Sequence, residues 1–298
     1  MTSLKNILII GASGALGVPT LNEFLNAAYK VSILSRKEST TTFPDGVKVF
    51  KADYKDLDSV KAAMEGQDVV ISIVGGHAVS DQRVLIDAAL AAGVKRFFPS
   101  EYGPYTRDPK MAEINPYTNP YKTAIVDYLR SKEHAMSWTA LVTGGFFDWA
   151  MGNGFYGFDF ATKTVGLIDD GVSAVASTTL ATIAKAIRAS VEHADETKNQ
   201  YVFVASFHHS QREILNEIEK LDDQKWTVNH LSSEDVIANG RRRVEAGDFA
   251  GIMDLTRGAA LGKLGLADLR PLGLWNERLG LPKDDIAEVL KKHIYKDI

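Results

Sequence analysis

Short apolar runs alternate with amphipathic stretches of helical length along the first half of the chain. The apolar runs predict strands over Asn6–Ile10, Lys30–Leu34, Val47–Lys51, Asp68–Val74, Lys95–Phe98 and Trp138–Val142. The stretches between them predict helices over Leu16–Ala28, Leu57–Met64, Gln82–Ala92 and Tyr121–Ser131. Strands that alternate with helices are typical of βαβ units around a parallel sheet. A long polar loop over Ser100–Pro120 interrupts the series, and such loops in compact domains are usually functional.

The alternation weakens beyond Gly144, where the chain becomes rich in glycine and aromatic residues. Here the pattern predicts strands over Thr164–Ile168 and Tyr201–Ala205, and helices over Leu180–Val191, Gln211–Leu221, Ser232–Ala246 and Asp284–His293. The whole pattern predicts an α/β protein with a Rossmann-type doubly wound parallel sheet over residues 1–150 and a smaller C-terminal lobe over residues 151–298. We expect this lobe to be interwoven with the sheet and to bind a substrate.

A glycine-rich turn follows the first strand, with the sequence Gly11-Ala12-Ser13-Gly14-Ala15-Leu16-Gly17. In such a turn Gly11 allows the sharp exit from the strand, Gly14 lets the backbone approach a pyrophosphate, and Gly17 lets the helix pack closely on the sheet. The helix N-terminus then offers unpaired N–H groups to the phosphates. Because the turn lies between a predicted strand and a predicted helix, it indicates a dinucleotide site, the alternative being a purely structural turn.

The end of the second strand bears on the choice between NADP and NAD. An arginine at this position accommodates the 2′-phosphate of NADP, whereas a carboxylate binds the 2′-hydroxyl of NAD. Arg36 and Lys37 follow this strand and favour NADPH, unless they form only a solvated basic corner. Glu38 would suit NAD if the strand ended later. Asp53 follows the third strand, either near the adenine or at a helix N-terminus.

The residues after the fourth strand are further candidates for cofactor binding. Ligands of open α/β sheets gather at the carboxyl ends of the strands, and Val74, Gly75 and Gly76 stand at such an end. The two glycines would let the nicotinamide half of a dinucleotide approach. His77 either faces the cofactor or is an ordinary loop residue.

Composition and charge narrow the classes of function. The 298 residues include no cysteine, which excludes disulfides and thiolate chemistry, and no spacing of ligands indicates a metal site. A net charge of −4 gives no reason to expect nucleic acid or an anionic membrane as partner. No stretch approaches the ~20 apolar residues of a membrane span. We therefore expect a cytoplasmic protein that acts on a small molecule; its oligomeric state is left open.

The run Arg96-Phe97-Phe98-Pro99-Ser100-Glu101-Tyr102-Gly103 resembles a signature of isoflavone reductase-like and phenylcoumaran benzylic ether reductase-like proteins. These belong to the NmrA-like branch of atypical short-chain dehydrogenases. The resemblance also covers the glycine-rich turn and the Asp68–Ser72 run, and it spans at least residues 5–150. It implies an NADPH-dependent reductase with a single lysine at its site.

The lysine that matches the family's position is Lys122. An ordinary short-chain dehydrogenase carries Tyr-x-x-x-Lys, but the residue four positions earlier is Thr118, which fits the atypical family. Lys122 opens a predicted helix beside the nicotinamide, where it would hold the ribose. With a pKa lowered by burial and by the helix terminus, it could also move a proton. A solvated helix lysine is the alternative.

Aromatic residues surround the predicted catalytic position. Tyr102 stands where the family has phenylalanine, which adds a hydroxyl group to the cleft. After the sixth strand, Gly145 and Phe146 are expected to cover the nicotinamide, and Phe147 and Trp149 to begin an aromatic substrate pocket. Ordinary lobe core is the alternative for each aromatic side chain.

Two functions of different classes follow from this pattern. The first is an NADPH-dependent reductase that transfers hydride to a small aromatic or conjugated substrate. The second is a non-catalytic NmrA-like regulator that senses the dinucleotide and binds a protein partner, because a fold by itself does not imply catalysis. Lys122 and the aromatic stretch favour the enzyme.

Overall fold

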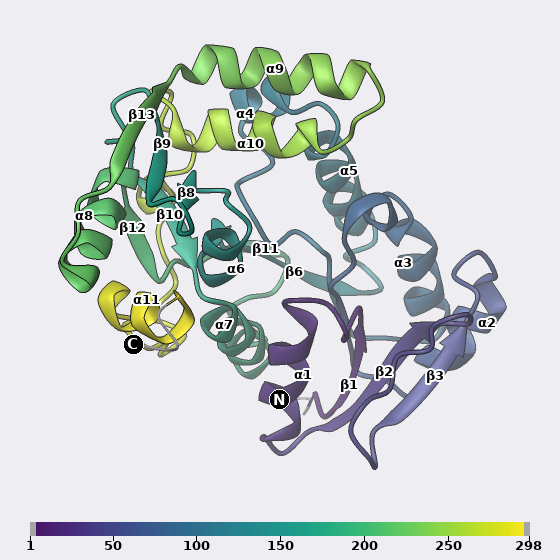
Figure 1. Cartoon of the computed structure of the whole chain (residues 1–298). Helices are drawn as coiled ribbons and strands as arrows, with labels where there is room; N and C mark the ends of the chain where they lie inside the picture. Colours follow the sequence, from purple (N-terminus) through teal and green to yellow (C-terminus); the bar gives the residue numbers. More distant parts are fainter. Residues whose placement is uncertain (1–3, 295–298) are drawn as a thin grey trace.

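A seven-stranded parallel sheet forms the main body of the chain (Figure 1). The computed structural model describes residues 4–294, without the side chains of residues 76, 77, 293 and 294. In spatial order the strands are β11 (Gln200–Phe203), β6 (Ser137–Val142), β5 (Arg96–Phe98), β4 (Val69–Ser72), β1 (Asn6–Ile10), β2 (Lys30–Arg36) and β3 (Lys48–Ala52). All neighbouring pairs run parallel.

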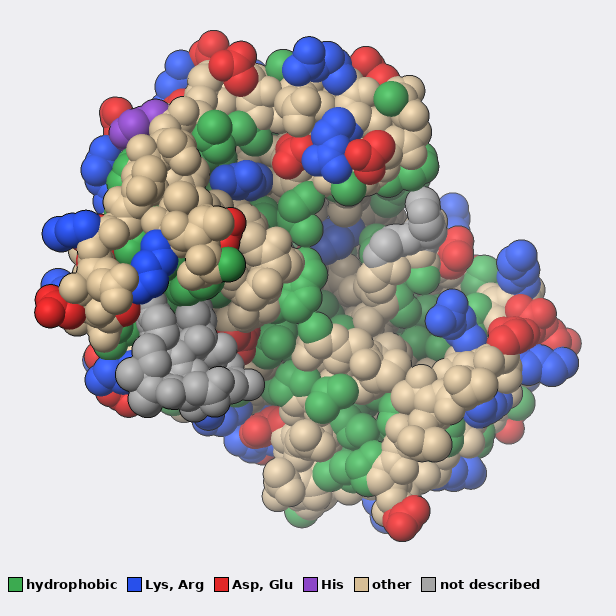
Figure 2. Space-filling model, viewed as in Figure 1, with side chains coloured by type: hydrophobic (Ala, Val, Ile, Leu, Met, Phe, Trp, Pro, Cys, Tyr) green, Lys and Arg blue, Asp and Glu red, His purple; other side chains and the backbone are tan. Residues whose placement is uncertain are grey.

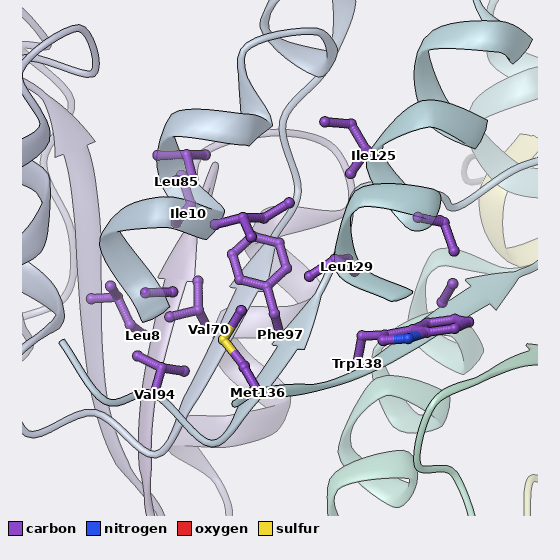
Figure 3. Close-up of a cluster of buried hydrophobic side chains, with 14 of the residues drawn as sticks. Leu8, Ile10, Val70, Leu85, Val94, Phe97, Ile125, Leu129, Met136 and Trp138 are labelled. Atoms are coloured by element: carbon purple, nitrogen blue, oxygen red, sulfur yellow. The ribbon is translucent and has the colours of Figure 1, made fainter. Parts of the chain in front are cut away.

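Helices cover both faces of this sheet because alternate strand residues point to opposite faces. Ile7 and Ile9 pack with α1 (Gly17–Leu25) and α7 (Leu180–Glu192). Leu8 and Ile10 pack on the other face, against α2 (Leu57–Met64), α3 (Gln82–Ala91) and α5 (Asn119–Arg130). Figure 3 shows this second cluster, in which Phe97 lies between Leu85 of α3 and Leu129 of α5. The arrangement confirms the predicted doubly wound fold.

A smaller lobe with its own hydrophobic core lies beside the sheet (Figure 1). The chain enters it at β7 (Gly145–Phe146) and α6 (Phe147–Gly152) and returns to the main sheet with α7 and β11. The strands of the lobe are β8 (Phe158–Asp159), β9 (Thr164–Ile168), β10 (Val175–Thr178), β12 (Phe207–His209) and β13 (Thr227–Leu231). Its other elements are α8 (Gln211–Asp222), α9 (Ser233–Glu245), α10 (Gly251–Leu261), η2 (Arg270–Leu272) and α11 (Ile286–Ile294).

Several predicted boundaries need correction. The loop predicted over Ser100–Pro120 contains a short helix, α4 (Pro109–Ile114), whose N-terminus is capped by the Asp108 carboxylate. Helix α5 begins at Asn119 rather than Tyr121, because Pro120 fits the first turn of a helix, where its missing N–H has no partner to lose. Helix α1 ends at Leu25 and not at Ala28.

The sequence pattern does not predict several elements of the structure. Most of these are short strands of the lobe that are defined by their pairing and not by their residue pattern: β7, β8, β10, β12 and β13. Helices α6 and α10 were also missed, and the glycines inside α10 obscure its helical pattern. A further short helix, η1 (Gly76–Val79), follows β4. Within residues 4–294 no helix is long and apolar enough to span a membrane.

The strand order creates the place where a ligand can bind. From β1 the chain proceeds to β2 and β3 on one side, whereas β4, β5 and β6 lie on the other side. The loops that follow β1 and β4 therefore diverge and leave a crevice at the carboxyl ends of these strands. Figure 2 shows a hollow between the main body and the lobe, with hydrophobic side chains along its walls and a Lys or Arg side chain at its bottom.

Candidate functional site

The glycine-rich turn connects β1 to α1 and approaches the exit of β4 very closely. Gly11 has a φ of +83°, and a Cβ atom on it would lie 2.2 Å from the carbonyl oxygen of Ile73. A Cβ atom on Gly17 would lie 2.1 Å from the carbonyl oxygen of Gly11 and would also overlap the backbone of Ala12. Both positions therefore require glycine, and Gly17 does so because the turn folds back on itself, not because the helix packs on the sheet.

Gly14 differs from the other two glycines. A Cβ atom here would meet only the Gly11 carbonyl oxygen, at an ordinary 3.5 Å. Ser13, Gly14 and Ala15 are exposed, whereas Ala12 and Leu16 anchor the turn in the core. Nothing within the protein requires residue 14 to lack a side chain. The exposed arc of the turn is therefore open to a ligand that requires close contact with the backbone. This geometry fits a pyrophosphate.

Basic side chains stand free at the end of β2. Arg36 is the last residue of the strand, and Lys37 follows it; both are exposed, as is Glu38. Arg36 lies close enough to the Tyr54 phenol to oppose the burial that raises the pKa of Tyr54 to about 12. No ion pair engages Arg36 within the described residues, so its guanidinium is available to a phosphate.

The remaining candidates near the first strands have local partners. The Asp53 carboxylate accepts a hydrogen bond from the Lys55 amide at 2.9 Å, while the N-cap of α2 is Asp56. After β4, the carbonyl of Val74 accepts a hydrogen bond from the Ser100 hydroxyl at 2.6 Å, which ties together the loops after β4 and β5.

The glycines that follow Val74 are less constrained. A Cβ atom on Gly75 would meet nothing within 4 Å, and Gly76 begins η1. A side chain at Gly75 would therefore meet open space. The side chain of His77 lies outside the described residues.

Lys122 lies in the first turn of α5, and its ammonium group reaches back to the loop after β5. Its Nζ donates a hydrogen bond to the Glu101 carbonyl at 2.7 Å and lies 3.4 Å from the Tyr102 carbonyl. Burial lowers the pKa of Lys122 below its ordinary value, and the negative charge of Glu101 opposes this shift. The positive end of the helix acts in the same direction as burial. An ammonium group with a lowered pKa, fixed at the carboxyl edge of a sheet, can hold or release a proton.

The Glu101 carboxyl group was not singled out from the sequence as a partner of Lys122. Its side chain is buried, and it accepts a hydrogen bond from the Thr106 hydroxyl. Burial raises the pKa of Glu101, while the charges of Lys122 and Arg107 and the Thr106 hydrogen bond oppose the rise. A buried carboxylate close to the lysine thus couples its protonation to that of Lys122.

The exit of β6 lies beside the same loop. The amides of Thr143 and Gly144 both donate to the carbonyl of Gly103, at 3.1 and 2.9 Å. Gly144 has a φ of +62°, and a Cβ atom on it would lie 2.1 Å from the Ala176 carbonyl oxygen. This left-handed turn directs Gly145 and Phe146 into β7, at the edge where Lys122 lies.

The aromatic candidates occupy different environments. Phe147 is buried in the lobe core against Phe207, with ring centroids 5.1 Å apart. This agrees with the alternative that Phe147 is an ordinary core residue of the lobe. Trp149 is 43% exposed and packs edge-to-face against Phe146. Tyr102 is buried, and its hydroxyl has no partner within the described residues. Burial raises the pKa of the Tyr102 phenol, so it stays protonated.

A buried polar cluster beneath β7 escaped the sequence reasoning. The Ser177 hydroxyl lies 2.7 Å from His209 Nε2, and a Cβ atom on Gly145 would lie 3.0 Å from the Tyr156 hydroxyl. Burial lowers the pKa of His209 to about 4, so the ring is neutral near pH 7. The available signal was the alternation of Phe207 and His209, whose side chains are both buried in β12.

Fold and site together define a Rossmann-type protein with a glycine-rich turn at the crevice and a lysine at the same sheet edge. Residues 3–245 match the model of the NmrA-like family. Oxidoreductase aprR of Aspergillus flavus is 35% identical over 257 residues, which cover 84% of this chain and 85% of that protein. Oxidoreductase poxI of Penicillium oxalicum is 31% identical over 251 residues, covering 82% and 78%. The chain therefore belongs to the NmrA-like family.

Solved structures share the fold over almost the whole length. The crystal structure of an isoflavone reductase superposes with a TM-score of 0.79 at 22% identity and covers 97% of this chain and 99% of that one. The structure of AtPrR2 with NADP+ and (+)pinoresinol gives a TM-score of 0.80 at 20% identity, with coverage of 99% and 100%. Both comparisons confirm the architecture, including the lobe.

Proposed function

We propose that this protein is a reductase that uses NADPH to reduce a small aromatic or conjugated substrate. The observation that carries the proposal is the Lys122 ammonium group. It is fixed by main-chain carbonyls, 2.7 Å from that of Glu101, and its pKa is lowered by burial. A merely solvated helix lysine would have neither property. The names of the relatives, two oxidoreductases, support the same class of activity.

The residues at the carboxyl edge of the sheet fit a dinucleotide. The exposed arc of the turn around Gly14 suits the pyrophosphate. The exposed guanidinium of Arg36, which forms no ion pair within residues 4–294, suits a 2′-phosphate, which favours NADPH over NADH. When bound, NADPH supplies the hydride equivalent. AtPrR2, one of the solved structures of the same fold, contains NADP+.

The other residues of the proposed site bind, orient or exclude water. The loop after β4, around Gly75, would lie beside the nicotinamide, and Gly145 and Phe146 would cover it. Trp149, which is partly exposed next to Phe146, would border the substrate. Lys122 would hold the nicotinamide ribose or move the proton that accompanies reduction. In this proposal the lobe binds the substrate. The protein would act in the cytoplasm.

The decisive experiment replaces Lys122 by methionine, which keeps most of the apolar stem and removes the charge. NADPH consumption would be followed by absorbance with aromatic ethers, enones and ketones. We expect the K122M variant to lose about 100-fold or more in kcat, as for the loss of a proton-transferring group. A fall in NADPH affinity beside this loss would report the contact of Lys122 with the ribose. The matched control K110M, an exposed lysine on α4, should retain full activity.

Two results would contradict the proposal. Tight NADPH binding without turnover of any substrate in the wild-type protein would favour a regulator that senses the dinucleotide. Failure of the wild-type protein to bind either NADPH or NADH in calorimetry would remove the dinucleotide site itself.

A further inference from the structure

Arg257, on α10, carries a partly buried guanidinium group without an adequate partner. Its Nη2 lies 3.5 Å from the carbonyl oxygen of Gly166, at the limit of a hydrogen bond, and its Nε is buried with no acceptor. Asp254, one helical turn earlier, attracts Arg257 but forms its ion pair with Arg243 at 2.6 Å. Within residues 4–294 no carboxylate forms an ion pair with Arg257. Burial also lowers the pKa of this guanidinium.

The chain satisfies another buried arginine completely. Arg96 is only 4% exposed, and it donates to the Ser137 hydroxyl at 2.6 Å, the Thr139 hydroxyl at 2.8 Å and the Ala194 carbonyl at 2.7 Å. A partly buried guanidinium group without such partners is less well solvated than one in water, which disfavours its charged form. The contrast indicates that the partner of Arg257 is supplied from outside the chain.

Two glycines leave room at the guanidinium. Gly157 has a φ of +80°, and a Cβ atom on it would lie 2.5 Å from Arg257 Nη2; a Cβ atom on Gly166 would lie 3.7 Å from the same nitrogen. Both residues thus lie close to the guanidinium group, and Arg257 as a whole is partly exposed. A planar group with free N–H donors at such an opening matches a carboxylate in shape and charge.

The position of Arg257 relates it to the site. Gly157 ends the segment that begins with β7, whose Gly145 and Phe146 we place over the nicotinamide, and continues through α6. Because Arg257 Nη2 lies 3.5 Å from the carbonyl oxygen of Gly166 in β9, the guanidinium group lies within the lobe, which we expect to hold the substrate.

We propose that Arg257 binds a carboxylate group of the substrate. The inference rests on the proposed function and narrows its substrate class to aromatic or conjugated acids. Arg257 is thus a specificity-determining residue, which fixes one end of the acid by charge-assisted hydrogen bonds. A site built for a carboxylate discriminates against an ester of the same shape, because the ester leaves the buried donors unsatisfied.

The test compares an acid with its methyl ester. Calorimetry at saturating NADP+ would measure 4-hydroxycinnamate, benzoate and phenylacetate, each beside its methyl ester. We expect the wild-type protein to bind at least one acid about 10–100-fold more tightly than its ester, the range typical of a charged hydrogen bond. The R257M variant should bind both forms equally. R242M, which removes an exposed arginine from neighbouring α9, should retain the preference.

Stability without ligand gives a second and independent readout. A structural arginine stabilises the fold, so R96M should lower the unfolding temperature clearly. A ligand-binding arginine without an internal partner destabilises the empty protein, so R257M should leave the unfolding temperature unchanged or raise it. If R257M lowered the unfolding temperature as much as R96M does, the proposal would be overturned. Equal binding of all acids and esters by the wild-type protein would also overturn it.

The same measurements separate this inference from the proposed function. R257M should still bind NADPH like the wild-type protein, because Arg257 contacts Gly157 and Gly166 of the lobe and not the glycine-rich turn. If the wild-type protein oxidises NADPH with neutral enones but shows no preference for acids, the proposed role of Arg257 is wrong. The proposed reductase function would then still stand. If it binds no dinucleotide, the reductase itself fails.

Discussion

The three glycines of the turn are equally spaced in the sequence, but the structure requires only two of them to be glycine. Gly11 and Gly17 are required by the protein, because a Cβ atom on either would overlap backbone atoms near 2 Å. Gly14 has no such conflict, since its nearest contact would be 3.5 Å. A side chain at Gly11 or Gly17 would therefore disturb the fold, whereas a side chain at Gly14 would affect only the binding of a ligand.

Arg36 should discriminate between the two nicotinamide dinucleotides. We expect R36A to weaken NADPH binding by about tenfold or more, because a charged hydrogen bond to the 2′-phosphate is lost, and to leave NADH binding nearly unchanged. Calorimetric titration with both cofactors measures the ratio. The K30A variant, at the opposite end of the same strand, is the matched control. Equal weakening for both cofactors would show that Arg36 does not face the 2′ position.

At the scale of elements, glycines set the distance between α9 and α10. A Cβ atom on Gly240 would lie 2.8 Å from the Gly251 carbonyl oxygen, and one on Gly251 would lie 2.5 Å from the Gly240 carbonyl oxygen. A Cβ atom on Gly258 would lie 2.6 Å from Ile237. The two helices pack backbone against backbone, which holds α10, and with it Arg257, in a fixed position beside the lobe sheet.

Replacing Gly240 by alanine tests this packing. Alanine favours a helix intrinsically, but here its methyl group must separate the two backbones, and overpacking of this kind costs about 1–3 kcal/mol. We expect G240A to lower the free energy of unfolding in denaturant titration. G152A, in α6, is the control, because a Cβ atom there would meet nothing within 4 Å. Equal stability of the two variants would mean that α9 and α10 are not in backbone contact.

At the scale of the whole molecule, the neutral His209 links stability to pH. The ordinary pKa of 6.5 falls to about 4 in the folded protein because of burial. As the pH falls below about 6.5, the unfolded chain takes up a proton that the folded protein refuses. The stabilisation is therefore complete above the ordinary pKa and is lost progressively as the pH approaches the folded value.

The variant H209Q should remove this dependence. Glutamine can still hydrogen-bond to Ser177 but does not titrate, and a depression of this size corresponds to roughly 3 kcal/mol. We expect the wild-type protein to lose more unfolding free energy than H209Q between pH 7 and pH 4. Thermal unfolding across this range measures the difference, with H193Q at an exposed histidine as control. Parallel curves for wild type and H209Q would contradict a buried neutral histidine.

The predictable part of the molecule is the part with local causes. The strands of the main sheet lie within two residues of their predicted ends, because continuous apolar runs mark strands buried on both faces. The glycine-rich turn and Arg36 were found because each stands at a fixed distance from a strand. Lys122 was found through the resemblance to the NmrA-like family. The lobe was seen only in outline, since its strands are very short and depend on their partners.

The order of apolar residues and glycines along the chain by itself determined the doubly wound sheet, the turn after β1 and the residues at the strand ends. The tertiary structure alone decided which charges are buried and which have partners. It placed the Glu101 carboxyl group near Lys122, His209 against Ser177, and Arg257 against Gly157 and Gly166. The physical reason is that desolvation and pairing depend on contacts between residues far apart in the chain, which a local pattern does not encode.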